Sequence, residues 1–257
     1  MLKYPGYCLR AKSKFKVHSP FVYKFYTEVI QDPEPEIPCN HIEKHRARLL
    51  RQKSLLETTD FGSGASHAAY KTRFRQVKEV ARHSSVNKKM GRLLYRLTLY
   101  AAPEDILEIG TAMGISTMYM ACAAPNSRLV SIEGCAVIAQ KALDGFRSLE
   151  IKNIELVQGN FDKWLPKILS GFKKLDMVFI DGNHKEKPTL SYFKSLLPKL
   201  HANSLVVIDD IHWSKGMEKA WKEIIAHQEV SISIDLFRTG ILLFRKDIEK
   251  QHFTLRF

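Results

Sequence analysis

Between residues 105 and 227 the sequence alternates short apolar runs with stretches of helical periodicity. This alternation constrains the fold more than any other feature of the chain. Consecutive parallel strands need a crossover connection, usually a helix, and a sheet built from such units is covered on both faces. Five strand-and-helix units follow one another, and the apolar runs lie near 106–110, 128–133, 154–157, 175–181 and 204–209. The pattern therefore predicts an α/β fold with a doubly wound parallel sheet.

The end of the chain departs from this alternation. Apolar runs at 230–236 and 240–244 are separated only by Phe237, Arg238 and Thr239. Three residues are too few for a crossover helix, so these two strands are expected to form an antiparallel hairpin.

The composition changes near residue 104. Residues 1–104 hold 20 Lys and Arg against 9 Asp and Glu, a net charge of +11, whereas residues 105–257 have a net charge of +2. Three segments upstream of the boundary have the apolar spacing of amphipathic helices. They are 42–56, 68–82 and 86–100. We therefore expect a basic, mainly helical N-terminal extension over 1–104 and a core over 105–257.

Overall composition places the chain among globular proteins, with 45% apolar and 26% charged residues. No apolar run approaches the roughly 20 residues needed to span a bilayer, and the first residues do not form a signal-peptide core. The four cysteines contain no C-x-x-C pair, which argues against a zinc knuckle or a disulfide framework. We expect a cytoplasmic protein without a transmembrane segment.

A glycine-containing turn, Glu-Ile-Gly-Thr-Ala-Met-Gly over 108–114, follows the first predicted strand. Ligands of open α/β sheets bind beyond the carboxyl ends of the strands, where glycines allow close approach of the backbone. The turn lacks the Lys-Ser/Thr of a phosphate loop and the glycine spacing of a dinucleotide motif. The next strand ends in Glu133, 23 residues after Gly110, where a carboxylate can bind both hydroxyls of a ribose.

Residues 106–117 closely resemble the first motif of class I S-adenosylmethionine-dependent methyltransferases, and the resemblance extends over about 86–245. It implies a Rossmann-like sheet of seven strands with the last antiparallel, and S-adenosylmethionine as cofactor. The residues that it places around the methionine part of the cofactor are Glu108, Gly110, Thr111, Gly114 and Ser116. It places Glu133 at the ribose, Asn160 and Phe161 at the adenine, and Asp181 beside the cofactor.

Carboxylates follow the fourth and fifth strands, in Ile-Asp-Gly-Asn-His over 180–184 and at Asp209 and Asp210. This spacing resembles the metal site of catechol and caffeoyl-CoA O-methyltransferases. The resemblance implies that Asp181, Asp209 and Asp210 hold Mg²⁺ or another divalent cation, which would acidify the acceptor hydroxyl. In another interpretation, Asp209 and Asp210 cap the helix that follows.

His184 falls where the catechol enzymes carry a catalytic lysine, so we expect His184 and Asp181 to be catalytic. A histidine can serve as a general base near neutral pH. His212 and Trp213 follow the acidic pair and are expected to border the acceptor pocket, unless Trp213 and Trp221 instead pack the next helix against the sheet.

The resemblance predicts methylation of a small-molecule hydroxyl, assisted by a divalent metal. The N-terminal region then serves as a lid, a substrate contact or a homodimer contact. An RNA methyltransferase that uses the basic N-terminal region is an alternative, because basic charge attracts nucleic acid without sequence specificity. A cofactor-binding protein without catalysis is another.

Overall fold

The computed structural model describes residues 3–31, 39–59 and 72–257. Proline-rich residues 32–38 and the glycine-containing residues 60–64, whose sequences predict loops, lie outside the described residues, as does the start of the helix expected at 68–82.

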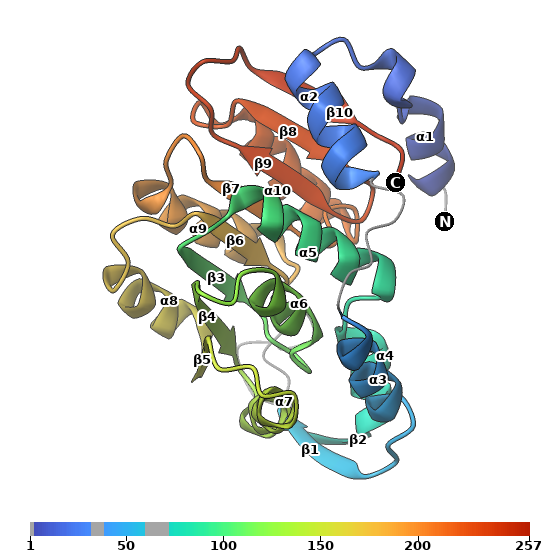
Figure 1. Ribbon diagram of the computed structural model, residues 1–257, viewed down its shortest axis with the longest axis vertical. Helices are drawn as coiled ribbons and strands as arrows, with labels where there is room; N and C mark the ends of the chain where they lie inside the picture. The colour runs from blue at the N-terminus through green and yellow to red at the C-terminus, as the bar shows by residue number, and fades with distance from the viewer. Residues whose placement is uncertain (1–2, 32–38, 60–71) are drawn as a thin grey trace.

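Eight strands form one mixed sheet in the order β10-β8-β9-β7-β6-β3-β4-β5 (Figure 1). Their bounds are β3 Asp105–Ile109, β4 Arg128–Glu133, β5 Ile154–Gln158, β6 Met177–Ile180, β7 Leu205–Ile208, β8 Ile232–Asp235, β9 Gly240–Leu243 and β10 Gln251–Thr254. Strand β9 pairs antiparallel with both β7 and β8, and the other ladders of this sheet are parallel. The doubly wound fold with its antiparallel C-terminal hairpin is therefore confirmed.

Strand β10 is an eighth strand, which the seven-stranded prediction lacks. It pairs in parallel with β8, from Gln251 opposite Ile232 to Thr254 opposite Asp235. Its sequence, Gln-His-Phe-Thr, is mostly polar, and it lies at the edge of the sheet, where one side of a strand needs no partner. Hydrophobic runs therefore give no signal for it.

Two hydrophobic cores cover the two faces of the sheet. Because side chains alternate along a strand, Ile106 joins one core and its neighbour Leu107 the other. The first core includes residues of α5 (Lys88–Ala101), α6 (Ile115–Ala123) and α7 (Ala136–Ser148). The second includes residues of α8 (Phe161–Ser170), α9 (Glu186–Leu196) and α10 (Lys215–Ala226), and a short 3-10 turn, η3 (Leu197–Lys199), follows α9.

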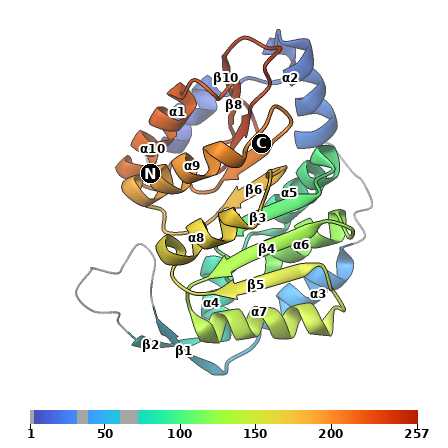
Figure 2. The ribbon, with the colours of Figure 1, turned by 90° about the vertical axis from the view of Figure 1, so that its left-hand side faces the viewer.

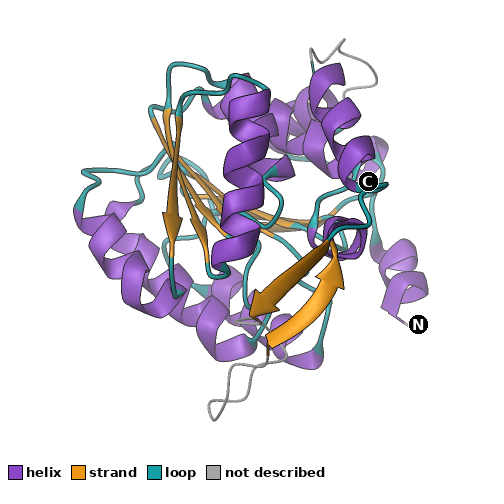
Figure 3. Cartoon of the chain, turned by 90° about the horizontal axis from the view of Figure 1, so that it is seen from below, coloured by secondary structure: helices purple, strands orange, loops and turns teal. Residues whose placement is uncertain are grey.

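Within the described residues, the N-terminal region is helical except for one antiparallel pair of strands. Its helices before α5 are α1 Lys3–Arg10, η1 Lys14–Lys16, α2 Pro20–Phe25, η2 Tyr26–Ile30, α3 Asn40–Leu49 and α4 Val77–Ser84. The helices predicted over 42–56 and 68–82 are wrong in part, because β1 (Leu55–Thr59) and β2 (Thr72–Gln76) form an antiparallel pair there. Figure 3 shows this pair standing apart from the main sheet, and Figure 2 shows it beyond α7. Thr72 at the start of β2 is β-branched and favours a strand, a local preference that the apolar spacing of 68–82 concealed.

The segment before the first Rossmann strand shares the core of the sheet. Val22, Phe25, Ile42 and Leu93 belong to the same buried cluster as Ile106. The helix predicted over 86–100 is confirmed as α5, whose first turn is capped by the side chain of Asn87. None of the described helices has the length and apolar character needed to cross a membrane.

The two ends of the chain are joined by main-chain and tyrosine hydrogen bonds. The amide of Lys12 donates to the carbonyl of Thr254 at 2.8 Å, and the hydroxyl of Tyr7 donates to the carbonyl of Leu255. The hydroxyl of Tyr26 donates to the carbonyl of Arg256 at 2.7 Å. Figure 1 shows α1 and α2 beside β10, so the N-terminal helices protect the edge that this strand forms.

Tyr26→Phe is expected to lower the free energy of unfolding by about 1–3 kcal/mol. The side chain is fully buried, and the change leaves the Arg256 carbonyl and the Gln31 amide without the hydroxyl that they both contact. Urea titration measures the effect. Tyr23→Phe, on an exposed ring of the neighbouring helix α2, is the matched control and should be nearly neutral. Equal losses in the two variants would contradict the role given to the Tyr26 hydroxyl.

Candidate active site

Gly110 brings the loop after β3 against the end of β6. Its backbone has φ +106°, and a Cβ atom here would overlap the main-chain oxygen of Asp181. The amide of Asp181 donates to the carbonyl of Ile109 at 2.9 Å, which closes the two strand ends together. Only glycine satisfies both the backbone angle and the close approach.

Glu108 lies beneath this turn with no exposed surface. Its carboxylate accepts hydrogen bonds from Ser116 at 2.5 Å, from Ser131 at 2.6 Å and from Thr117. Burial raises the pKa of Glu108 to about 7, although the three hydroxyls oppose this shift. The hydroxyl of Thr111 is 2.5 Å from that of Ser131. The predicted cofactor residues Glu108, Thr111 and Ser116 thus come together, but their side-chain oxygens bond within the protein and fix the shape of the turn.

Glu133 ties the glycine turn to the end of β4. One carboxylate oxygen accepts from the amide of Ala112 at 2.8 Å, and the other accepts from the amide of Cys135 at 2.9 Å. The side chain is partly exposed at the edge of the sheet, and burial is the main reason why its pKa is raised. Gly114, with φ +75°, begins α6 on the other side of the turn.

The two residues predicted at the adenine are arranged differently from one another. The side-chain oxygen of Asn160 accepts from the amide of Lys163 at 3.2 Å and so caps α8. The ring of Phe161 lies against Gly182 and meets Tyr192 edge-on, with 6.3 Å between ring centroids. Phe161 therefore lies near the β6 loop, while the amide oxygen of Asn160 already has a donor.

Three carboxylates and a histidine meet at the ends of β6 and β7, as the sequence predicts for neighbouring parallel strands. Nε2 of His184 is 3.6 Å from Oδ1 of Asp181, and Nδ1 is 3.9 Å from Oδ2 of Asp210. Burial, followed by the charges of Asp209 and Asp210, raises the pKa of Asp181 well above its usual range. Burial, followed by the charge of Asp209, raises the pKa of Asp210.

The backbone around this cluster is strained. Asn183, His184 and Asp210 have φ values of +67°, +31° and +54°, in the left-handed region that favours glycine. Such residues persist only where surrounding structure holds them, and they concentrate at functional sites.

Arg238, which the sequence analysis did not identify, lies among these carboxylates. Its Nη2 and Nε atoms donate to Oδ2 of Asp209 at 2.9 and 3.1 Å, and Nε is 3.3 Å from Oδ1 of Asp210. The hydroxyl of Thr239 is 2.8 Å from Oδ1 of Asp209. Both residues come from the β8–β9 turn. The one sequence signal was the predicted hairpin, whose three-residue turn lies at the carboxyl edge of its neighbouring strand β7.

The carboxylates as they lie do not fit the predicted divalent ion. A divalent ion needs carboxylate oxygens that point into its coordination shell. Both oxygens of the fully buried Asp209 instead accept hydrogen bonds, one from Arg238 and the other from Thr239. Among the described residues, no group of three or more His, Cys, Asp and Glu side chains has an arrangement that could hold a metal ion. The alternative of helix capping is also not seen, because Ser214 caps α10.

Aromatic side chains border the same edge. His212 is held between Asp235, at 2.8 Å, and Glu218, at 3.4 Å, and its ring stacks on Phe237 with 5.7 Å between centroids. Tyr4 of α1 meets Phe237 edge-on at 4.9 Å, so the N-terminal helix reaches this turn. The two tryptophans differ in burial, because Trp221 of α10 is buried in the core and Trp213 is 69% exposed.

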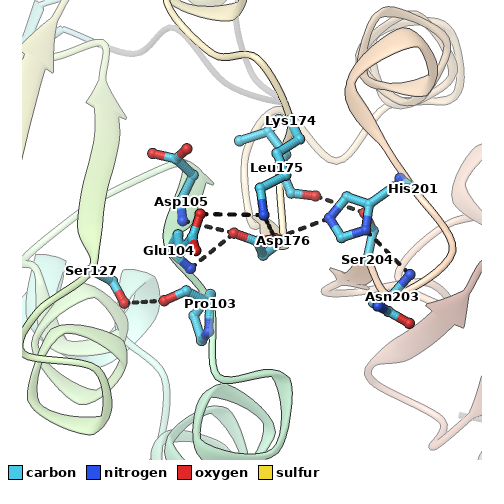
Figure 4. Close-up of polar contacts among 10 residues, drawn as sticks. All are labelled: Pro103, Glu104, Asp105, Ser127, Lys174, Leu175, Asp176, His201, Asn203 and Ser204. Atoms are coloured by element: carbon cyan, nitrogen blue, oxygen red, sulfur yellow. Dashed lines mark hydrogen bonds and ion pairs between the residues drawn. The ribbon is translucent and has the colours of Figure 1, made fainter.

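A second polar cluster lies at the opposite, amino edge of the sheet (Figure 4). There Asp176 accepts from the amides of Glu104 and Asp105, each at 2.9 Å, and is 3.0 Å from Nε2 of His201. Lys174 is 3.5 Å from the same carboxylate. Main-chain donors, a histidine and a lysine therefore surround Asp176, and the cluster joins the beginnings of β3 and β6.

Comparison with known proteins agrees with this architecture. Residues 107–211 match the family model described as a methyltransferase domain. A catechol O-methyltransferase of Niastella koreensis is 33% identical over 132 residues, which are 49% of this chain and 58% of that protein. The chain thus spans less than two thirds of this relative.

Solved structures share the fold. The S-adenosylhomocysteine-bound methyltransferase PaMTH1 of Podospora anserina superposes with a TM-score of 0.61 at 13% identity, over 90% of this chain and 97% of that one. The O-methyltransferase TomG of Streptomyces achromogenes, in complex with S-adenosylmethionine, gives 0.56 at 24% identity, over 63% and 82%. The predicted resemblance in sequence to catechol O-methyltransferases is confirmed by the relative from Niastella koreensis, and the solved structures confirm the methyltransferase fold.

Glu108→Gln is expected to weaken the pH dependence of stability. The pKa of Glu108 is about 7 in the folded protein against an ordinary value of 4.5, so this group's stabilisation is complete below about pH 4.5 and is lost as the pH rises through about 7. The loss amounts to about 3 kcal/mol. Urea unfolding at about pH 5 and pH 8 should give a smaller difference for the variant than for the wild type. Glu155→Gln, at an exposed ion pair with Arg128, should leave the difference unchanged. An equal change in the free energy of unfolding between about pH 5 and pH 8 in the wild type and in Glu108→Gln would contradict the raised pKa of Glu108.

Proposed function

We propose that this chain, which has the fold of class I methyltransferases and resembles catechol O-methyltransferases in sequence, transfers a methyl group from S-adenosylmethionine to a hydroxyl of a small molecule. One observation carries the proposal. A glycine turn braced by Glu133 and a histidine flanked by two carboxylates lie at the same edge of the sheet, where ligands of open α/β sheets bind.

The residues around the turn fit S-adenosylmethionine, which when bound supplies an electrophilic methyl group on its sulfonium centre. The main chain of Gly110, Thr111 and Gly114 would lie against the methionine part, with Glu108 and Ser116 fixing the turn from below. Glu133 is partly exposed, and each of its oxygens keeps a lone pair for a ribose hydroxyl. Phe161 offers a ring face for the adenine, whereas the amide oxygen of Asn160 remains with α8.

His184 is the proposed general base, and Asp181 is its partner. The imidazole takes the proton of the acceptor hydroxyl, and the carboxylates of Asp181 and Asp210 stabilise the resulting imidazolium from its two nitrogens. Both separations exceed an ordinary hydrogen bond, so neither nitrogen is committed to a partner before the acceptor binds. The main chain of Asp181 also adjoins Gly110 of the glycine turn, which supports a position between cofactor and acceptor.

Residues 1–104 are proposed to form the acceptor-side wall, next to a core over 105–257. Contact of Tyr4 and Tyr7 with Phe237 supports this role, since Phe237 adjoins Arg238 in the same turn. Trp213, largely exposed beside the acidic pair, is available to a flat acceptor or to a second subunit.

Calorimetry with S-adenosylmethionine and S-adenosylhomocysteine, followed by transfer of a labelled methyl group to a panel of phenols and catechols, tests the proposal. We expect both ligands to bind and Gly110→Arg to abolish binding, because its side chain has no room beside Asp181. RNA is assayed in parallel. Failure of the wild type to bind either ligand at millimolar concentration would overturn the proposal. Binding without transfer would leave a non-catalytic cofactor-binding protein, and transfer to RNA alone would support the RNA alternative.

His184→Ala is expected to lower turnover by about 10²–10⁴-fold, the usual contribution of a general base, with little change in affinity for S-adenosylhomocysteine. The matched control is His201→Ala, which removes a histidine paired with an aspartate at the other edge of the sheet and should keep near-normal turnover. Equal turnover in the two variants would exclude His184 as the base.

A further inference from the structure

Arg238 occupies the centre of the acidic cluster from a distant part of the chain. Its guanidinium donates twice to Asp209 and contacts Asp210, and the charges of these two carboxylates also act on Asp181. A charge-assisted contact of a fixed guanidinium with carboxylates is among the stronger polar interactions in proteins. The cluster therefore already contains a cation supplied by the protein.

The turn that carries Arg238 is held in place on both sides. The amide of Ile211 donates to the carbonyl of Arg238 at 3.0 Å, which joins the turn to the loop after β7. Phe237 adopts φ +71°, and its amide donates to Oδ1 of Asp235 at 2.7 Å. Arg238 is thus positioned by main-chain contacts as well as by its ion pair.

Asp209 is shielded from an external ion by burial and by its partners. It has no exposed surface, and its two oxygens bond to Arg238 and to Thr239. A metal ion that bound Asp209 would have to displace the guanidinium of Arg238. The displaced guanidinium would then remain close to the ion as a second positive charge.

We infer that the guanidinium of Arg238 takes the place of a divalent cation among Asp181, Asp209 and Asp210, and that it orients the acceptor oxygen. The side chain is 46% exposed, and its Nη1 atom has no hydrogen bond to the described residues. Nη1 is free to donate to an acceptor that carries a partly negative oxygen, such as a phenolate. Arg238 would position the acceptor and take no part in proton or methyl transfer, so it is a positioning residue. The inference rests on the proposed function only for the identity of the acceptor.

Titration of the protein with Mn²⁺, followed by the electron paramagnetic resonance signal of the free ion, tests the inference without reference to activity. The wild type, alone and with S-adenosylhomocysteine, should bind no Mn²⁺ at this cluster up to about millimolar concentration. Arg238→Ala should raise the affinity for Mn²⁺ by about tenfold or more, because the competing charge is removed from an oxygen site. Arg238→Ala combined with Asp210→Asn should lose that gain.

Arg245→Ala is the matched control, since Arg245 forms an exposed pair with Asp247 outside the cluster. The Mn²⁺ affinity of Arg245→Ala should equal that of the wild type. Stoichiometric Mn²⁺ binding by the wild type that Asp210→Asn abolishes would overturn the inference, and this measurement stands even if Arg238→Ala fails to fold. An unchanged Mn²⁺ affinity in a folded Arg238→Ala protein would also overturn it.

Methyl transfer provides a second readout. Turnover should be unchanged in EDTA, and Arg238→Lys, which keeps the charge but loses the planar fork, should raise KM for the acceptor more than it lowers kcat. A loss of turnover in EDTA that Mg²⁺ restores would overturn the inference. Failure of cofactor binding would instead reject the proposed function and leave the Mn²⁺ result standing.

Discussion

Parallel pairing of β3, β4, β6 and β7 is the constraint on which the site depends. It brings the carboxyl ends of four strands to one edge, so residues far apart in sequence become neighbours. The close approach of Gly110 to Asp181 fixes the spacing between two of those ends. A side chain at position 110 would push the loop away from β6 and separate the glycine turn from the acidic cluster.

Buried carboxylates then divide into two kinds according to what satisfies them. Glu108 is surrounded by hydroxyls that can donate without carrying a charge, and its pKa is raised. Asp209 is satisfied by a guanidinium, which compensates its charge directly. The first arrangement holds a turn in shape, whereas the second fixes the charge of the cluster. Burial of a carboxylate is thus no guide to its role until its donors are known.

The sequence predicts those parts of the molecule that local pattern controls. The order of strands and helices after residue 104, the hairpin and the meeting of Asp181, Asp209 and Asp210 with His184 follow from apolar periodicity and parallel topology. The β1–β2 pair and β10 do not follow, because their short, polar segments gain stability from neighbours rather than from their own apolar spacing. The prediction that Asp181, Asp209 and Asp210 hold a divalent ion came from a resemblance to catechol and caffeoyl-CoA O-methyltransferases, and that resemblance gave no sign of the guanidinium of Arg238, which contacts Asp209 and Asp210.

Arg238 shows why such partners escape sequence analysis. It lies 29 residues after Asp209, beyond α10 and β8, and no short motif joins the two. The antiparallel pairing of β9 with β7 returns the β8–β9 turn to the carboxyl edge of β7, where Arg238 and Thr239 meet Asp209. The hairpin predicted from the sequence did not specify which strand it would lie beside. A search for the counter-charge of a buried acid should therefore include the turns that topology carries to the same edge. In this chain the β8–β9 turn thus supplies two partners of Asp209, while the strands that flank it extend the sheet.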